Sequence, residues 1–110
     1  MKILLDHCVP APLAKMLPGH ESQIAYNLGW AKLRNGELIE AAQNSGLDLL
    51  LTSDKNLRYQ QNLSSRRLAI LVLPTNNWGI LRNMTDEIAD VISSMHPGEY
   101  RELKLGNPTS

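Results

Sequence analysis

The sequence of 110 residues has little cysteine, no excess of either charge and no long apolar run. Its single cysteine, Cys8, excludes a disulfide within the chain and is typical of a reducing compartment. Lysine and arginine number 11, as do aspartate and glutamate, so no overall charge attracts nucleic acid or a membrane surface. No apolar run approaches the roughly 20 residues of a membrane span, and Asp6 and His7 interrupt the apolar start well short of a signal peptide. We therefore expect a cytoplasmic protein that does not bind membranes.

The composition is typical of a single globular domain. Hydrophobic residues make up 43% of the chain and charged residues 20%, which is enough apolar material for a core without disulfides or structural metals. We expect the domain to cover residues 1–96 and residues 97–110 to form a polar C-terminal tail. No paired zinc-ligand spacing and no internal repeat are present.

Short apolar runs alternate along the chain with segments of helical periodicity. We expect strands over residues 3–5, 22–25, 47–52 and 68–73, and helices over residues 10–17, between Asn35 and Gly46, over residues 55–62 and over residues 78–95. Strands that alternate with helices form a mainly parallel sheet with helices on both faces. The sequence therefore predicts an α/β fold.

Two aspartates follow two of these expected strands. Asp6 comes directly after the first strand, and Asp54 comes two residues after Thr52, which ends the central strand. Parallel sheets bind ligands beyond the carboxyl ends of their strands, so we expect both carboxylates at one edge. Two carboxylates held close together repel each other, and a hard cation such as Mg2+ or Mn2+ removes that repulsion. The alternative is that each aspartate only caps the helix that follows it.

Five short segments follow one another in a recognisable order. They are Ile-Leu-Leu-Asp (3–6), Gly-His-Glu (19–21), Leu-Gly-Trp (28–30), Asn-Gly-Glu-Leu (35–38) and Leu-Thr-Ser-Asp-Lys-Asn (51–56). From Met1 to about Arg82, the chain thereby resembles the short PIN-like domains, which are relatives of VapC-type toxins. The resemblance implies a PIN-like three-layer α/β/α sandwich with a central, mainly parallel sheet. It also implies metal-dependent cleavage of RNA.

The same resemblance suggests roles for three acidic residues. Asp6 matches the first metal-binding acid of the family, and Asp54 matches the acid that follows the central strand. Glu37 matches the acid at the start of the intervening helix. Glu40, one turn later, is the alternative, but a position in the first turn points more directly at the loops. We therefore expect Asp6, Glu37 and Asp54 to be both the metal ligands and the catalytic residues.

Four further residues beside these acids are auxiliary candidates. Asn35 and Asn56 stand where many relatives have additional acids. An amide oxygen can still bind a cation or position water, but each change removes one negative charge and weakens metal binding. Thr52 lies beside Asp54, and His7 lies where it could contact a phosphate. Cys8, in contrast, is interpreted as a small buried hydrophobic residue.

Basic residues follow the proposed metal-binding Asp54. We expect Lys55, Arg58, Arg66 and Arg67 to form a nucleic-acid-binding rim beside the site, with Tyr59 as a stacking residue. The alternative is an ordinary solvated surface.

Two functions of different classes follow from these residues. The first is a metal-dependent endoribonuclease with Mg2+ or Mn2+ as cofactor and RNA as substrate. It would be the toxin of a toxin–antitoxin pair, with an antitoxin protein as a partner and the capacity to form a homodimer. The second is a catalytically degenerate PIN-like domain that acts as an RNA- or protein-binding module. The acids Asp6, Glu37 and Asp54 favour the first function, and the amides Asn35 and Asn56 favour the second.

Overall fold

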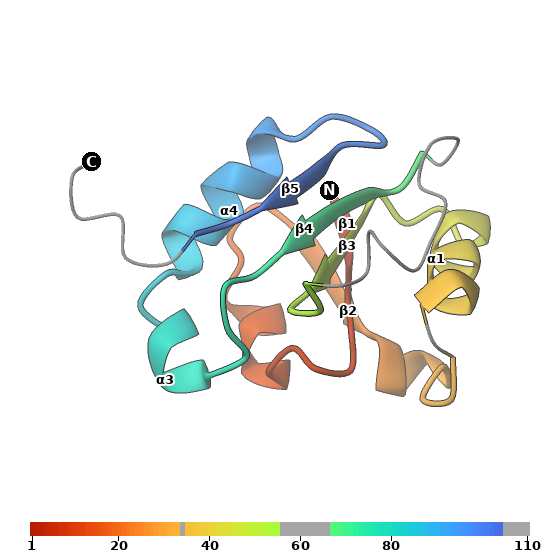
Figure 1. Cartoon of the computed structure of the whole chain (residues 1–110), viewed down its shortest axis with the longest axis horizontal. Coiled ribbons are helices and arrows are strands. Elements are labelled where there is room, and N and C mark those ends of the chain that lie inside the picture. Colours follow the sequence, from red (N-terminus) through yellow and green to blue (C-terminus); the bar gives the residue numbers. More distant parts are fainter. Residues whose placement is uncertain (34, 56–66, 105–110) are drawn as a thin grey trace.

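The computed structural model describes residues 1–33, 35–55 and 67–104. Within them, the strands are β1 (Lys2–Leu5), β2 (Glu21–Ile24), β3 (Leu49–Thr52), β4 (Ala69–Val72) and β5 (Tyr100–Glu102). The helices are the 3-10 helices η1 (Ala11–Lys15) and η2 (Ala25–Leu28) and the α-helices α1 (Asn35–Asn44), α3 (Trp78–Leu81) and α4 (Thr85–Ser94) (Figure 1).

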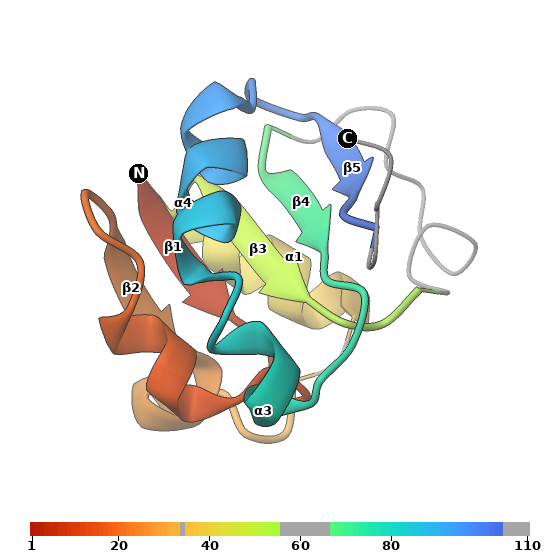
Figure 2. The same ribbon diagram turned by 90° about the vertical axis from the view of Figure 1, so that its left-hand side faces the viewer.

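The described strands form one parallel sheet in the order β2-β1-β3-β4-β5 (Figure 2). In the central register, Leu5 of β1 pairs with Leu51 of β3, and Leu51 pairs with Leu71 of β4. All three leucines are completely buried, as expected for central strands that are covered on both faces. The α/β fold with a mainly parallel sheet is therefore confirmed.

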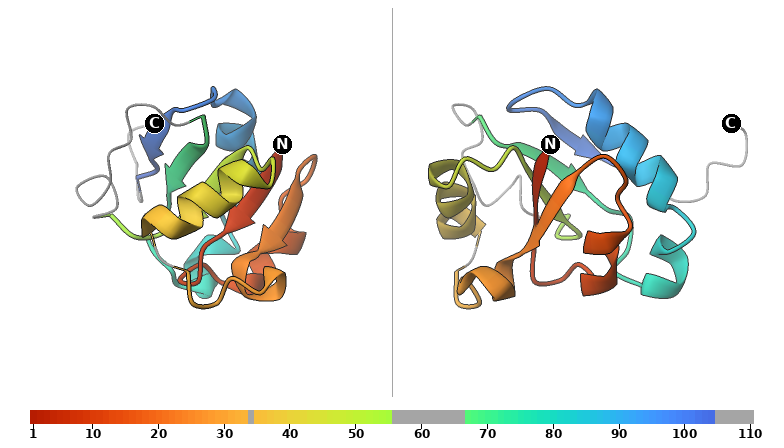
Figure 3. Two further views of the ribbon diagram at one scale, coloured as in Figure 1. Left: turned by 90° about the vertical axis from the view of Figure 1, so that its right-hand side faces the viewer. Right: turned by 180° about the vertical axis from the view of Figure 1, so that it is seen from behind.

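Helices cover both faces of this sheet. One face packs against α1, and the other packs against η1, α3 and α4 (Figures 1 and 3). Successive side chains of a strand alternate between the two layers: Leu49 and Leu51 lie in the core on the α4 side, and Leu50 lies in the core on the α1 side. The predicted three-layer α/β/α arrangement is thus present.

The predicted helix over residues 78–95 is divided into α3 and α4 in the structure. Asn77 caps α3 by accepting a hydrogen bond from the Ile80 amide at 3.3 Å, and Arg82 ends the helix after one turn. Leu81 and Ile88 face the same core on either side of the break. The periodic stripe therefore continues across the break, which is why the sequence predicted one helix.

One other described segment differs from its predicted length, and one prediction is not tested. The first helix, expected over residues 10–17, is the five-residue 3-10 helix η1. The helix expected over residues 55–62 lies, apart from Lys55, outside the described residues. Among the described helices, none has both the length and the apolar character needed to cross a membrane.

The sequence did not predict β5, which lies in the segment expected as a polar tail. This edge strand pairs with β4 through its backbone: the Ile70 amide donates to the Glu99 carbonyl, and the Leu103 amide donates to the Val72 carbonyl, both at 2.8 Å. Its residues are only half-buried, so the sequence of this strand lacks the hydrophobic alternation that would have predicted it. The sheet consequently extends past the expected boundary at residue 96.

Glu99 holds the connection between α4 and β5. Its Oε1 atom accepts from the His96 amide at 2.9 Å, and its Oε2 atom accepts from Nε of Arg101 at 2.8 Å. The hydrogen bond from His96, reinforced by the Arg101 guanidinium, lowers the pKa of Glu99 below its ordinary value of 4.5. Its charged form is therefore favoured by folding.

Replacing this carboxylate should change how stability depends on pH. Because the pKa is lower in the folded state, ionised Glu99 stabilises the fold above about pH 4.5, and this contribution disappears as the pH falls through the folded value. Urea unfolding of wild type and Glu99→Gln between about pH 3 and 7 should show a smaller loss of stability on acidification for the variant. Glu21→Gln, an exposed carboxylate on β2, is the control. Identical pH profiles for wild type and Glu99→Gln would contradict this role.

Candidate functional site

The strand order places a topological switch point between β1 and β3. The strand that follows β1 in the chain, β2, lies on one flank of this pair, and the strand that follows β3, β4, lies on the other flank (Figure 2). Loops that diverge from adjacent parallel strands leave a ligand-binding crevice between them, as in other sheets of the order 2-1-3-4-5. The residues that follow Leu5 and Thr52 line this position.

Asp6 is held at this switch point by the sheet itself. Its amide donates to the Leu51 carbonyl at 2.9 Å, which extends the β1–β3 ladder by one residue. The chain then turns, and the His7 amide donates to Oδ1 of Asp6 at 2.7 Å. The half-buried carboxylate therefore has a defined position at the end of a buried strand.

Thr52 connects the loop after β1 to the loop after β3. Among the described residues it is the only fully buried polar one. Its hydroxyl donates to Oδ2 of Asp6 at 2.8 Å and accepts from the Asp54 amide at 3.1 Å. A single buried hydroxyl thus ties the Asp6 carboxylate to the backbone of Asp54.

Cys8 belongs to the same polar network, which sequence reasoning missed. Its sulfur lies 3.8 Å from Oδ2 of Asp6 and 3.7 Å from Oγ1 of Thr52, and the Ser53 amide donates to it at 3.5 Å. The side chain is half-buried rather than a fully buried hydrophobic residue. The contact could have been predicted from the position of Cys8 two residues after Asp6, because a turn after the strand brings the Cys8 side chain back toward the Asp6 carboxylate.

The loop that leads into α1 reaches the same edge. Nε2 of His7 lies 3.1 Å from the carbonyl oxygen of Leu33, two residues before α1 begins at Asn35. Glu37 is exposed in the first turn of α1, and Glu40 is exposed one turn later. The beginning of α1 and the end of β1 are therefore neighbours.

The predicted acids are brought together only in part. Asp6 and the backbone of Asp54 share the Thr52 hydroxyl. In the described parts of the chain, however, no three histidine, cysteine, aspartate or glutamate side chains gather closely enough to hold a metal ion. Glu37 therefore does not form such a group with the two aspartates.

The structure describes only some of the remaining predicted residues. Lys55 is exposed directly after Asp54. Asn56, Arg58 and Arg66, together with Tyr59, lie outside the described residues.

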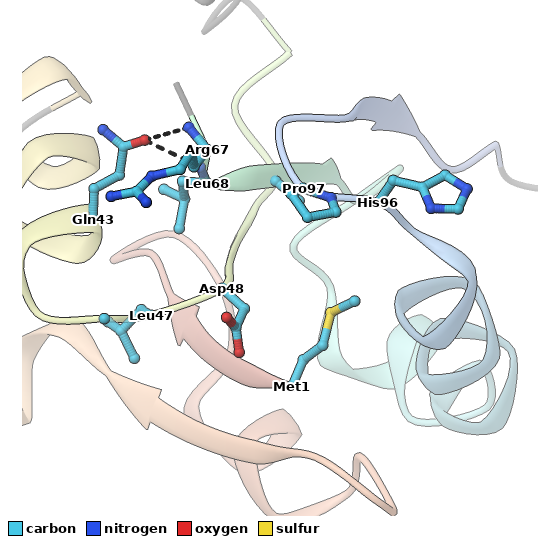
Figure 4. A pocket seen from close by; sticks show the side chains of 10 residues that line it. Met1, Gln43, Leu47, Asp48, Arg67, Leu68, His96 and Pro97 are labelled. Carbon is cyan, nitrogen blue, oxygen red and sulfur yellow. Dashed lines mark hydrogen bonds between the residues drawn. The ribbon is translucent and has the colours of Figure 1, made fainter. Parts of the chain in front are cut away.

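Arg67 lies at the opposite edge of the sheet from Asp54, which corrects the predicted rim. It precedes β4, and its amide donates to Oε1 of Gln43 near the end of α1 at 2.7 Å (Figure 4). Strand β4 spans four residues, or roughly 13 Å, between that edge and the carboxyl edge. The sequence did not reveal this because residues close along the chain can lie at opposite ends of one strand.

A pocket of about 470 Å3 opens at this amino edge (Figure 4). Its lining includes Gln43, Asp48, Arg67 and Pro97. The Asp48 carboxylate accepts from the Lys2 amide at 2.8 Å, so it serves to anchor the start of β1. The pocket is thus separate from the carboxylates at the other edge.

The donors at the carboxyl edge fit a hydrated divalent cation. Each carboxylate oxygen of Asp6 accepts one hydrogen bond from oxygen or nitrogen, from His7 or from Thr52, and retains further acceptor capacity. Mg2+ is commonly held by one or two carboxylates, several waters and the phosphates of a substrate. The Asp6 carboxylate therefore has the chemistry of one ligand for such a site.

The Thr52 hydroxyl should be needed for the stability of the loops. Thr52→Val keeps the shape of the side chain but leaves the Asp54 amide and the Asp6 carboxylate without their partner, which costs roughly 1–3 kcal/mol. Thr52→Ser keeps the hydroxyl and is the matched control. Urea unfolding and the NMR shifts of the His7 and Asp54 amides should separate the two variants. A valine variant with wild-type stability and wild-type amide shifts would contradict the proposed connection.

Comparisons with known proteins give no further assignment. No family model, no curated protein and no solved structure matches the chain. The likeness to PIN-like domains stays a prediction from the order of its motifs, and function is argued below from the geometry of the carboxyl edge.

Proposed function

We propose that the chain is a metal-dependent endoribonuclease whose active site lies at the carboxyl ends of β1 and β3. The observation that carries this proposal is the Thr52 hydroxyl, which binds Oδ2 of Asp6 and the amide of Asp54. Two acid-bearing loops are thereby linked at the switch point of a parallel sheet, where such folds bind ligands.

Asp6 and Asp54 would hold Mg2+ or Mn2+. Hydrogen bonds from His7 and Thr52 orient the Asp6 carboxylate before any ligand arrives, so little conformational freedom is lost on binding. Glu37, in the first turn of α1, would take part through a bridging water.

The chemistry would be hydrolysis of a phosphodiester. When bound, the cation neutralises charge on the phosphate and supports in-line attack by water. The residues of the chain would hold this arrangement: Asp6 and Asp54 orient the water, and Thr52 keeps the two loops in register. The Leu33 carbonyl can only accept, so Nε2 of His7 donates to it in the tautomer that carries the proton there. Nδ1 of the same ring would then be the nitrogen that contacts the leaving group.

The biological role proposed here follows the resemblance to toxins. The chain would act in the cytoplasm on RNA, with an antitoxin protein as its inhibitor and a second copy as a dimer partner. These partners rest on the order of the sequence motifs.

A second candidate function is a PIN-like domain that binds RNA or protein without cleaving it. The observation that favours it is the absence, in the described part of the chain, of three gathered metal-ligating side chains. The amides Asn35 and Asn56, which stand at acid positions of the family pattern, point in the same direction.

Metal binding and cleavage distinguish the two functions. Calorimetric titration should show that Mn2+ binds the wild type and that Asp54→Asn weakens binding by about tenfold or more, because one of two carboxylates is lost. The same variant should lose metal-dependent cleavage of a mixed single-stranded RNA pool while keeping its stability. Asp90→Asn, an exposed position on α4, is the matched control.

Each outcome of this experiment decides between the candidates. Binding and cleavage that are both lost in Asp54→Asn and kept in Asp90→Asn would support the nuclease. RNA binding without metal binding or cleavage at millimolar metal would overturn it in favour of the binding module. Cleavage unaffected by Asp54→Asn would remove this residue from the site.

A further inference from the structure

Tyr26 is the most exposed large apolar side chain among the described residues, with 72% of its surface accessible. It lies in η2, directly after the edge strand β2. A single exposed aromatic ring is not unusual by itself. Its meaning depends on what lies beside it.

The ring is located at the same edge of the sheet as the carboxylates. Ile24, the last residue of β2, pairs with Leu5, the last residue of β1. Tyr26 follows Ile24 by two residues, and Asp6 follows Leu5 by one. Neighbouring strands are about 4.8 Å apart and a residue spans at most about 3.8 Å, so the two backbones lie within roughly 16 Å of each other. A few nucleotides of a single strand can bridge this distance.

The segment that carries Tyr26 is well anchored. Gly29 adopts a left-handed conformation with φ of 79°, and the Trp30 amide donates back to the Ala25 carbonyl at 3.0 Å. Leu28 and Trp30 pack against the core beneath α1. Because the apolar side chains of this segment face inward, its solvent side presents Tyr26 from a defined backbone.

Lys32 belongs to the segment that contacts the residue after Asp6. It is exposed and immediately precedes Leu33, whose carbonyl oxygen lies 3.1 Å from Nε2 of His7, the residue after Asp6. Lys32 is thus connected to Asp6 through Leu33, its neighbour in the chain, and through His7, which contacts Leu33. Its position differs from that of the predicted basic rim, which followed Asp54.

We infer that Tyr26 and Lys32 form a binding surface for single-stranded RNA that leads to Asp6. The phenol ring would stack on a base, and the lysine would contact a phosphate, which together bind a strand with little sequence preference. This inference rests on the proposed function, because it names the contacts of the same substrate.

The surroundings of Tyr26 favour a nucleic acid over a protein partner. The other exposed large apolar residues of the described chain are Met1, Met16 and Ile80. Met1 precedes β1 at the amino edge, and Met16 and Ile80 belong to the η1 and α3 region on the opposite face of the sheet (Figures 1 and 3). The ring therefore stands apart from a continuous apolar patch of the kind that proteins bury when they associate.

RNA binding measured without cleavage tests this surface. Full-length Asp54→Asn in EDTA, titrated into a fluorescein-labelled single-stranded RNA of mixed sequence, serves as the reference. Adding Tyr26→Ala should weaken binding by about 5- to 150-fold, the effect of losing one stacked base, whereas Tyr26→Phe keeps the ring and should retain affinity. The exposed position of Tyr26 leaves folding intact, which circular dichroism verifies.

Salt dependence tests the lysine. Lys32→Gln should reduce the slope of log affinity against log salt by about 0.7, as expected for one lost phosphate contact on a single strand. Lys2→Gln removes an exposed lysine from the amino edge of β1 and should leave the slope unchanged.

The outcomes separate this inference from the proposed function. Wild-type affinity and salt slope in the Tyr26→Ala and Lys32→Gln variants would overturn the inference, while metal-dependent cleavage through Asp54 would still stand. RNA binding that depends on Tyr26 in a protein that neither binds Mn2+ nor cleaves RNA would support the inference and overturn the nuclease. RNA that fails to bind the reference protein at all would overturn the inference.

Discussion

The parallel pairing of β1 with β3 at the centre of the sheet is the constraint on which the rest of the structure depends. Leu5 and Leu51 are completely buried partners, covered by helices on both faces. The side chains of residues 3–5 and 49–52 are buried, so packing sets the register of the two strands, and the first residues beyond them must emerge together. The proximity of the loops that follow β1 and β3 is therefore a consequence of the core.

The polar interactions of the site begin at Thr52, at the end of the apolar core. Thr52 lies inside the apolar layers, so its hydroxyl must find partners, and those available are the Asp6 carboxylate and the Asp54 amide. A buried hydrogen bond is stronger and more directional than one in water. The same burial that holds the sheet together consequently orders the acid-bearing loops, and Cys8 fills the remaining space between them.

Charge in this neutral chain acts through its local arrangement. Several charged residues lie at one of the two edges of the sheet: Asp6, Asp54 and Lys55 follow the carboxyl ends of strands, and Asp48 and Arg67 precede the amino ends. At physiological salt, charges further apart than about 8 Å are strongly screened, so each edge acts independently. A substrate at the carboxyl edge would respond to the lysines there and not to Arg67.

The sequence by itself determined the α/β class, the central strands, the position of Thr52 at the end of one of them and the positions of Asp6 and Asp54 beyond them, because apolar runs and turn residues are local signals. Only the tertiary structure decided which strands are neighbours. The pairing of the strands brings Thr52 next to Asp6 and places Arg67 at the opposite edge of the sheet. It also leaves Glu37 outside a three-acid group and adds β5 to the sheet. Each of these depends on backbone pairing between distant segments, which leaves no periodic pattern in the chain.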